Sequence, residues 1–287
     1  MKTEINKNKR KEVFIMKTLP VGLQLYTVRT EMQKSVPETL AAVKAMGYDY
    51  VEPAGLFGYS YADFRAELDK AGLKAICAHV PLVELAGDTA AVVDGYKVIG
   101  CECLAVPYLG EGQRPGDPDF DDILATINKI GEICASKGVI LVYHNHDFEF
   151  TRLPDGRYGL DYMYETVSKE HLQTELDCCW VSVGGEDPAT YIRKYAGRCP
   201  VVHLKDYEGS KSEGMYELIG IEKKATANPN TFKFRPVGSG KLDWKGILEA
   251  AAESGAKYVI VEQDQSYEQS CLDAAKQSRE YLKSLGW

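Results

Sequence analysis

The sequence predicts an α/β protein whose chain forms a single-domain (β/α)8 TIM barrel. Eight short apolar runs alternate with longer helical patterns, which is typical of βα units around a parallel sheet. The length of 287 residues is usual for a barrel of this kind. An open doubly wound sheet is the alternative, but it normally carries a glycine-rich loop after its first strand. LQLYTVRTE (23–31) contains no glycine, so the barrel is favoured.

Each predicted strand is a short, mainly apolar run, and all except 101–109 carry a polar residue near their end. In chain order, the predicted strands cover residues 21–26, 48–53, 73–80, 101–109, 139–146, 172–177, 201–206 and 258–264. The predicted helices between them place apolar residues three and four positions apart and stop at a glycine. The clearest of these helices cover residues 38–47, 61–72, 121–138 and 244–255.

Two connections, 108–119 and 207–236, are long and rich in Gly, Pro and charged residues. Both follow strands, so we expect them at the end of the barrel where TIM barrels build their active sites. For 207–236 the hypothesis is a lid or a contact for a partner, and the alternative is a plain surface insertion. Residues 1–16 are basic, and their apolar patch is too short for a signal peptide. We therefore expect a disordered tail there, followed by a barrel over 17–287.

Composition argues against several classes of protein. The formal net charge of −8 disfavours nucleic acid and an anionic membrane surface as partners. No apolar run approaches the roughly 20 residues of a membrane span. The eight cysteines form no pair of CxxC motifs, which indicates reduced thiols rather than a disulfide framework or structural zinc. We expect a cytoplasmic protein with a small-molecule substrate; a homo-oligomer or a small partner subunit stays open.

Polar side chains stand at the ends of the predicted strands, where the active site of a TIM barrel forms. Four of the five histidines are among them. The full set is Gln24, Glu52, His79, His144, His146, Asp177, His203, Lys205 and Glu262. Asp177, His203 and Glu262 end strands six, seven and eight, which are neighbours in a barrel. One divalent ion such as Mn²⁺, Mg²⁺, Co²⁺ or Zn²⁺ would find suitable ligands there.

Taken alone, each of these residues also has a structural interpretation. A solitary Asp177 is more often a helix N-cap, and a solitary His203 is more often a hydrogen-bonded core histidine. Lys205 and Asp206 are compatible with an exposed ion pair that contributes little stability. Trp180 is equally compatible with a sugar-facing surface and with core packing. It is the combination at adjacent strand ends that favours a metal site.

PVGSGK (236–241) is similar to a phosphate-binding loop. The motif GxxxxGK[ST] would require Gly at position 235 and Ser or Thr at position 242. This chain has Arg235 and Leu242, so a glycine-rich turn before a helix is the better interpretation.

Six segments carry a resemblance to a known family: LQLYTVR (23–29), YHNHDFEF (143–150), ELDCCWVSVGGEDP (175–188), VVHLKD (201–206), VGSGKLDW (237–244) and VIVEQD (259–264). Over about residues 20–285 the chain resembles the xylose isomerase-like TIM-barrel family. This is the sugar phosphate isomerase/epimerase superfamily, which includes tagatose/psicose 3-epimerases and inosose dehydratases.

The resemblance implies one divalent metal ion, commonly Mn²⁺, held by side chains from strands five to eight. Asp177, His203 and Glu262 match the last three ligand positions. For strand five the prediction is Glu149, with His144 as the alternative. The candidate proton-transfer and charge-stabilising groups are His144, Glu149, Glu262 and Lys205. The expected substrate contacts are His146, Gln24, Glu52, His79 and Trp180.

The leading hypothesis is a metal-dependent sugar isomerase or epimerase. It would abstract a proton next to the carbonyl of a keto-sugar, through an enediolate that the metal stabilises. The alternative is a lyase of the same family, which expels a β-leaving group as in inosose dehydration or cleavage of a 3-keto-glycoside. A non-catalytic sugar-binding protein is less favoured because the ligand set is present. Since no second basic residue is anchored to a motif at the strand ends, we expect a non-phosphorylated substrate.

Overall fold

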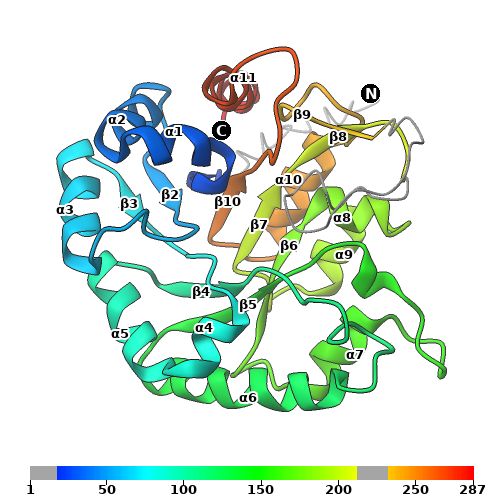
Figure 1. Cartoon of the computed structure of the whole chain (residues 1–287). Helices are drawn as coiled ribbons and strands as arrows, with labels where there is room; N and C mark the ends of the chain where they lie inside the picture. Colours follow the sequence, from blue (N-terminus) through cyan, green and yellow to red (C-terminus); the bar gives the residue numbers. More distant parts are fainter. Residues whose placement is uncertain (1–17, 212–231) are drawn as a thin grey trace, which may run out of the picture.

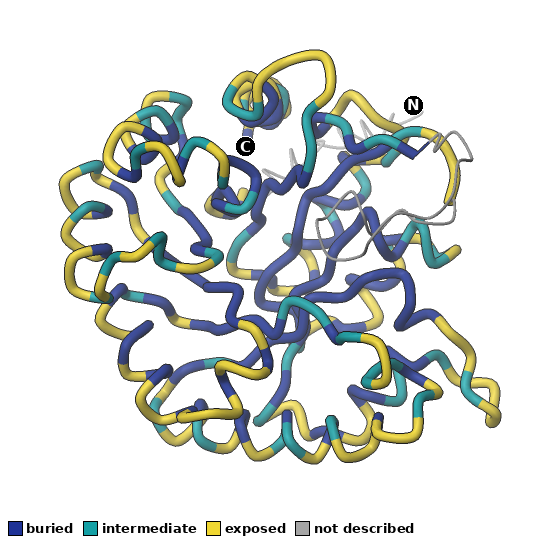
Figure 2. Tube along the Cα trace, in the orientation of Figure 1, coloured by how far each residue is buried: buried dark blue, intermediate teal, exposed yellow. Residues whose placement is uncertain are grey.

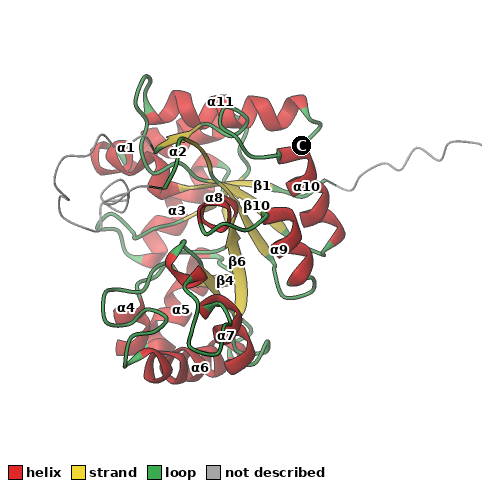
Figure 3. Ribbon diagram, turned by 90° about the vertical axis from the view of Figure 1, so that its right-hand side faces the viewer, coloured by secondary structure: helices red, strands yellow, loops and turns green. Residues whose placement is uncertain are grey.

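The computed structural model describes residues 18–211 and 232–287, which form parallel strands enclosed by helices (Figures 1 and 3). The expected tail at 1–16 and most of the expected lid segment within 207–236 lie outside the described residues. Buried backbone runs through the central strands, and exposed backbone lies on the outer helices and loops (Figure 2). No helix in the described part of the chain is long and apolar enough to cross a membrane.

Eight parallel strands pair in the order β3-β2-β1-β10-β7-β6-β5-β4. Hydrogen bonds between the chain after β3 and β4 close this sheet into a barrel, for example Ala105 N to Ala78 O at 2.8 Å. All eight predicted strands are present, each shorter than predicted. They are β1 (Val21–Gln24), β2 (Tyr50–Glu52), β3 (Lys74–Ala75), β4 (Cys103–Val106), β5 (Ile140–His144), β6 (Gln173–Asp177), β7 (Val201–Leu204) and β10 (Tyr258–Val261).

The four predicted helices are present with ends within two residues of the expected ones. Local signals explain these ends: Ser60 Oγ accepts a hydrogen bond from Asp63 N at the start of α3, and Gly72 ends it with φ of 70°. The α-helices are α1 (Arg29–Lys34), α2 (Val36–Ala45), α3 (Tyr61–Ala71), α4 (Leu82–Gly87), α5 (Thr89–Ile99), α6 (Phe120–Ser136), α7 (Gly159–Thr166), α8 (Cys178–Val183), α9 (Pro188–Lys194), α10 (Trp244–Glu253) and α11 (Cys271–Ser284). Two 3-10 helices are η1 (Leu25–Val28) and η2 (Phe148–Phe150).

An antiparallel hairpin that the sequence did not predict flanks the end of β7. It pairs β8 (Asp206–Glu208) with β9 (Lys233–Arg235). Its aromatic side chains pack against Trp180, and the Trp180 and Phe232 rings stack with centroids 6.0 Å apart. The expected loop over 207–236 is therefore partly sheet.

The glycine-rich turn at 236–241 folds around a carboxylate of the protein itself. Asp206 Oδ2 accepts hydrogen bonds from Gly238 N at 3.1 Å, Gly240 N at 2.9 Å and Trp244 Nε1 at 2.7 Å. A Cβ atom on Gly240 would lie 2.1 Å from Asp206 Oδ1, so this position requires glycine. The amide groups of the turn thus bind a buried aspartate, which supports the turn interpretation over a phosphate loop.

The barrel interior changes character along its axis. Its lower part is apolar and contains Ile76, Cys103, Val142, Val201 and Ile260, as is usual for TIM barrels. The part nearer the C-terminal ends of the strands contains buried carboxylates and imidazoles instead. Burying charged groups is costly unless they are paired or bind a metal, so this polar layer identifies the functional end of the barrel.

Candidate metal centre

Strand register brings the polar strand ends together. His144 in β5 is paired with Glu175 in β6, and Asp177 in β6 is paired with His203 in β7. Glu262 directly follows β10, which pairs with β7. Sequence positions more than 100 residues apart therefore meet at one end of the barrel.

Four of these side chains form what we call the outer group: His144, Asp177, His203 and Glu262. Their ligand atoms all lie within 4.8 Å of one another, and all four residues are buried. His144 Nε2 lies 3.7 Å from Asp177 Oδ2 and 4.0 Å from Glu262 Oε2. Asp177 Oδ2 accepts no hydrogen bond within the described residues. Two imidazoles and two carboxylates with a buried, under-used oxygen fit a divalent transition-metal ion.

Glu149 lies outside the outer group. Its carboxylate accepts hydrogen bonds from the Tyr143 hydroxyl and, at 2.8 Å, from His146 N. Burial raises the pKa of Glu149 to about 8. It therefore braces the loop after β5, and of the two strand-five candidates only His144 belongs to the outer group.

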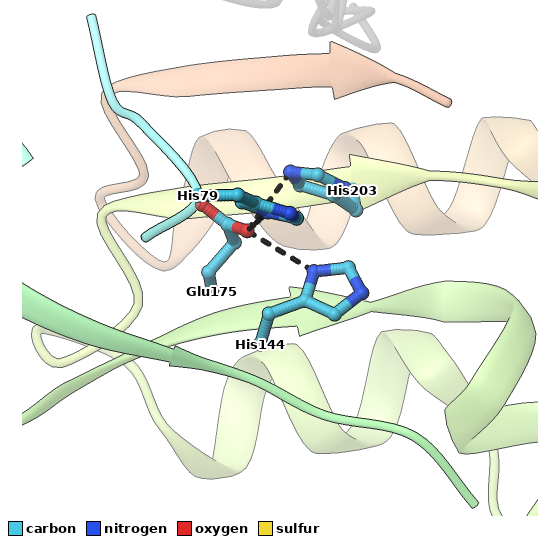
Figure 4. Close-up of side chains that lie close together, drawn as sticks. All are labelled: His79, His144, Glu175 and His203. Carbon is cyan, nitrogen blue, oxygen red and sulfur yellow. Dashed lines mark hydrogen bonds and ion pairs between the residues drawn. The ribbon is translucent and has the colours of Figure 1, made fainter. Parts of the chain in front are cut away.

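A second cluster, which we call the inner group, consists of His79, His144, Glu175 and His203 and shares its two ligand histidines with the outer group (Figure 4). Glu175 Oε1 accepts hydrogen bonds from His79 Nε2 at 2.7 Å and from His144 Nδ1 at 3.0 Å, and lies 3.0 Å from His203 Nε2. The sequence analysis missed Glu175, although it precedes Asp177 by two positions and so faces the same side of the strand.

Gln24 and Glu52 lie beside the inner group and do not line the cavity described below. Gln24 Nε2 donates to Glu52 Oε2 at 2.8 Å, and the same oxygen lies 2.7 Å from His203 Nε2. Both residues are fully buried, and neither lines the cavity. The geometry makes them supports for the histidines, whereas the sequence predicted substrate contacts.

Lys205 is buried among three carboxylates. Its Nζ lies 2.9 Å from Glu262 Oε2, 2.9 Å from Asp264 Oδ2 and 3.3 Å from Asp177 Oδ2. Burial lowers the pKa of Lys205, but these three carboxylates outweigh it and raise that pKa well above its usual value. Lys205 therefore does not form the exposed ion pair with Asp206 that was its structural interpretation in the sequence analysis.

A cavity of about 370 Å³ opens above the outer group, within the size range of small-molecule sites. Four residues with polar side chains that the sequence analysis did not select, Tyr26, Glu84, Tyr108 and Asp264, contribute to it. Asp264 had a detectable signal, because it follows Glu262 by two positions. The cavity is lined by Tyr26, Ala54, Gly55, His79, Pro81, Glu84, Pro107, Tyr108, His144, His146, Lys205, Glu262 and Asp264.

Of the predicted substrate contacts, His79 and His146 line the cavity and Trp180 does not. Trp180 is fully buried behind His146, with ring centroids 5.1 Å apart. Burial lowers the pKa of His146 well below its usual value, so its ring is neutral. Trp180 thus orients a cavity-lining ring and packs in the core.

Comparison with known proteins agrees with this fold. A family model described as xylose isomerase-like TIM barrel matches residues 40–285. The chain belongs to this family. The fold and the family resemblance inferred from the sequence are therefore confirmed.

Curated relatives of the chain are named inosose dehydratase. One from Clostridium botulinum is 27% identical over 165 residues, which is 55% of this chain and 51% of the relative. One from Geobacillus kaustophilus is 22% identical over 279 residues, which is 86% of each chain. The chain thus spans about half the length of the first of these relatives and most of the second.

Solved structures share the fold at low sequence identity. A sugar phosphate isomerase/epimerase from Parabacteroides distasonis has a TM-score of 0.74 at 21% identity, over 94% of this chain and 96% of that chain. The IOLI protein with a binding zinc atom has a TM-score of 0.68 at 15% identity, over 93% of this chain and 98% of that chain.

Proposed function

We propose that this protein is a metal-dependent enzyme that removes a proton next to the carbonyl group of an uncharged keto-sugar or keto-polyol. The observation that carries this proposal is the outer group, whose His144 and Glu262 also line the cavity. A divalent ion held by His144, Asp177, His203 and Glu262 would supply Lewis-acid stabilisation of charge on substrate oxygens. Mn²⁺ is our expected ion, and the zinc-bound IOLI neighbour makes Zn²⁺ the first alternative.

The chain's own side chains have separate roles in this proposal. Lys205 and His203 hold the pKa of Glu262 well below its usual value against the opposing effect of burial, so this carboxylate is ionised, as a metal ligand has to be. The ammonium of Lys205 lies beside it and can stabilise negative charge that develops on a substrate oxygen. Neutral His146 lines the cavity and can donate a hydrogen bond to a sugar hydroxyl or accept one from it.

An uncharged substrate fits the state of the basic residues near the cavity. Arg29 donates to the backbone oxygens of Tyr26 at 2.9 Å and Asp264 at 2.7 Å. Arg235, the second arginine considered as a phosphate ligand, pairs with Glu208 and Glu268 at 2.5 Å each. These guanidinium groups already have partners, so a phosphate would have to compete with them.

Two outcomes of proton removal remain candidates. Return of the proton to the neighbouring carbon gives isomerisation, and its return to the opposite face of the same carbon gives epimerisation; these were the leading hypothesis from the sequence. Expulsion of a hydroxyl or alkoxyl group from the next carbon gives a lyase. The names of the curated relatives favour this second candidate, although their identities of 22% and 27% are low.

Metal analysis of purified variants tests the site. We expect about one divalent ion per chain in the wild type after identical remetallation, as for a mononuclear site with three or four protein ligands. Asp177→Asn and His144→Ala should lose it, and Glu149→Gln should retain it. Elemental mass spectrometry measures the content, and full metal occupancy in both Asp177→Asn and His144→Ala would refute the assignment.

Substrate assays then separate the two outcomes. The metal-loaded protein is incubated separately with a ketohexose, an inosose and a 3-keto-glucoside. The products are separated from the substrate by chromatography, and their molecular masses are measured by mass spectrometry. A product of unchanged mass identifies an isomerase or epimerase, and loss of water or of the aglycone identifies a lyase. No turnover of any of the three by a metal-loaded protein would contradict the proposed chemistry.

A further inference from the structure

We infer that Glu175 is a positioning residue that fixes which ring nitrogen of His144 and of His203 faces the outer group. This inference rests on the proposed metal site. It concerns the inner group, which consists of His79, His144, Glu175 and His203 (Figure 4). Glu175 is fully buried, and one of its oxygens, Oε1, contacts all three imidazole rings.

The two ring nitrogens of His144 face different groups. Nδ1 lies 3.0 Å from Glu175 Oε1, whereas Nε2 lies 3.7 Å from Asp177 and 4.0 Å from Glu262. A neutral imidazole carries one N–H group and one lone pair. The hydrogen bond to Glu175 places the N–H group on Nδ1, so the lone pair of Nε2 faces the outer group.

His203 shows the same arrangement with the nitrogens exchanged. Nε2 lies 2.7 Å from Glu52 Oε2 and 3.0 Å from Glu175 Oε1, and Nδ1 lies 2.9 Å from Glu262 Oε2. Two carboxylates thus face Nε2 and only one faces Nδ1. Nε2 keeps its proton when the ring is neutral, and Nδ1 is the nitrogen available to an ion.

The inner group could instead be read as a second metal site, because its ligand atoms also lie within 4.8 Å of one another. Distances decide against this reading. Atoms bound about 2.1 Å from a tetrahedral ion lie about 3.4 Å apart. The contacts of Glu175 with His79, His144 and His203 are 2.7, 3.0 and 3.0 Å, which are hydrogen-bond lengths. In the outer group, His203 Nδ1 and Glu262 Oε2 are also at hydrogen-bond length, 2.9 Å, but His144 Nε2 lies 3.7 and 4.0 Å from the two carboxylates, too far for hydrogen bonds.

The β6 strand explains how one segment supplies both groups. Glu175 and Asp177 are two positions apart on β6, so both side chains point into the barrel at successive levels. Asp177 belongs to the outer group, and Glu175 contacts the ring nitrogens that face away from it, Nδ1 of His144 and Nε2 of His203. Glu175 also binds His79, which lines the cavity, and so links the metal ligands to a substrate-contacting ring.

The experiment compares Glu175→Gln with Glu149→Gln, a control that makes the same replacement at another fully buried carboxyl group outside both groups. Partners that orient ligating histidines typically contribute 10–100-fold to metal affinity. We expect zinc affinity, measured by competition with a chromophoric chelator, to fall about 10–100-fold in Glu175→Gln. Glu149→Gln should stay within about threefold of the wild type, because its carboxylate touches no ligand ring. Equal zinc affinity in Glu175→Gln and the wild type would overturn the inference.

A second readout needs no metal. Long-range ¹H–¹⁵N NMR spectra report the tautomer of each of the five histidines, and single substitutions assign them. In the metal-free wild type we expect His144 to carry its proton on Nδ1, and in Glu175→Gln a part of the population should move it to Nε2. Finding the proton of His144 on Nε2 in the wild type refutes the inference even if the protein binds no metal. If Glu175→Gln does not fold, Glu175→Asp withdraws the carboxylate by one methylene and takes its place.

Discussion

Replacing Lys205 with methionine tests whether charge balance holds the outer group together. Lys205 is 1% exposed, and its Nζ lies 2.9 Å from carboxylate oxygens of both Glu262 and Asp264 and 3.3 Å from Asp177 Oδ2. Methionine keeps an unbranched side chain of similar length in this environment and removes only the charge. Three buried carboxylates then lose their common cation.

Removing one partner of a buried ion pair typically costs about 3–5 kcal/mol, because the other charge stays buried without compensation. We therefore expect Lys205→Met to lower the free energy of unfolding of the metal-free protein by about 3–5 kcal/mol. A divalent ion at Asp177 and Glu262 would restore positive charge, and at 100 times its Kd an ion adds about 2.7 kcal/mol. The ion stabilises the wild type as well, so the deficit of the variant should shrink on addition of zinc only because the ion replaces the missing ammonium group and therefore binds the variant more tightly.

Urea unfolding in the presence of chelator and of zinc measures both quantities. Lys233→Met is the control, because Lys233 lies 3.5 Å from Glu268 in a pair whose side chains are 40% and 60% exposed. Such exposed pairs contribute about 0–1 kcal/mol. If metal-free Lys205→Met unfolds within about 1 kcal/mol of the wild type, the reasoning about buried charge is wrong.

Two further predictions concern buried carboxylates away from the ligands. Burial raises the pKa of Glu149 to about 8 from 4.5, so the folded protein holds a proton that the unfolded chain has released. The free energy of unfolding of the wild type should therefore fall as the pH rises from about 4.5 to about 8, by at most about 1.4 kcal/mol per pH unit. Urea unfolding of Glu149→Gln should lack that part of the fall. Asp206→Ala leaves the donors of Gly238, Gly240 and Trp244 without their acceptor, and each can cost about 1–3 kcal/mol. A loss below about 1 kcal/mol in urea unfolding would contradict the bracing role of Asp206.

The sequence by itself determined the barrel and three of the four proposed ligands. Alternation of apolar runs with helical patterns identifies βα units, and the lack of a glycine-rich loop after the first strand favours the closed barrel, which places the C-terminal ends of all strands together. Asp177, His203 and Glu262 stand at those ends, so their proximity follows from topology without any knowledge of side-chain packing. The antiparallel hairpin after β7 escaped detection because β8 and β9 are only three residues each and are far apart in the chain.

Only the tertiary structure placed His144, and not Glu149, beside Asp177, His203 and Glu262, and revealed the inner group. β5 ends at His144 and the chain then enters a 3-10 helix, so the alternation of a strand no longer predicts where Glu149 points. The role of Glu175 depends on the register between β5 and β6, which sets it opposite His144. Gln24 and Glu52 lie one level below the cavity for a similar reason. Strand patterns indicate which residues face the barrel interior, but the depth of each side chain follows from strand stagger, which only the folded barrel establishes.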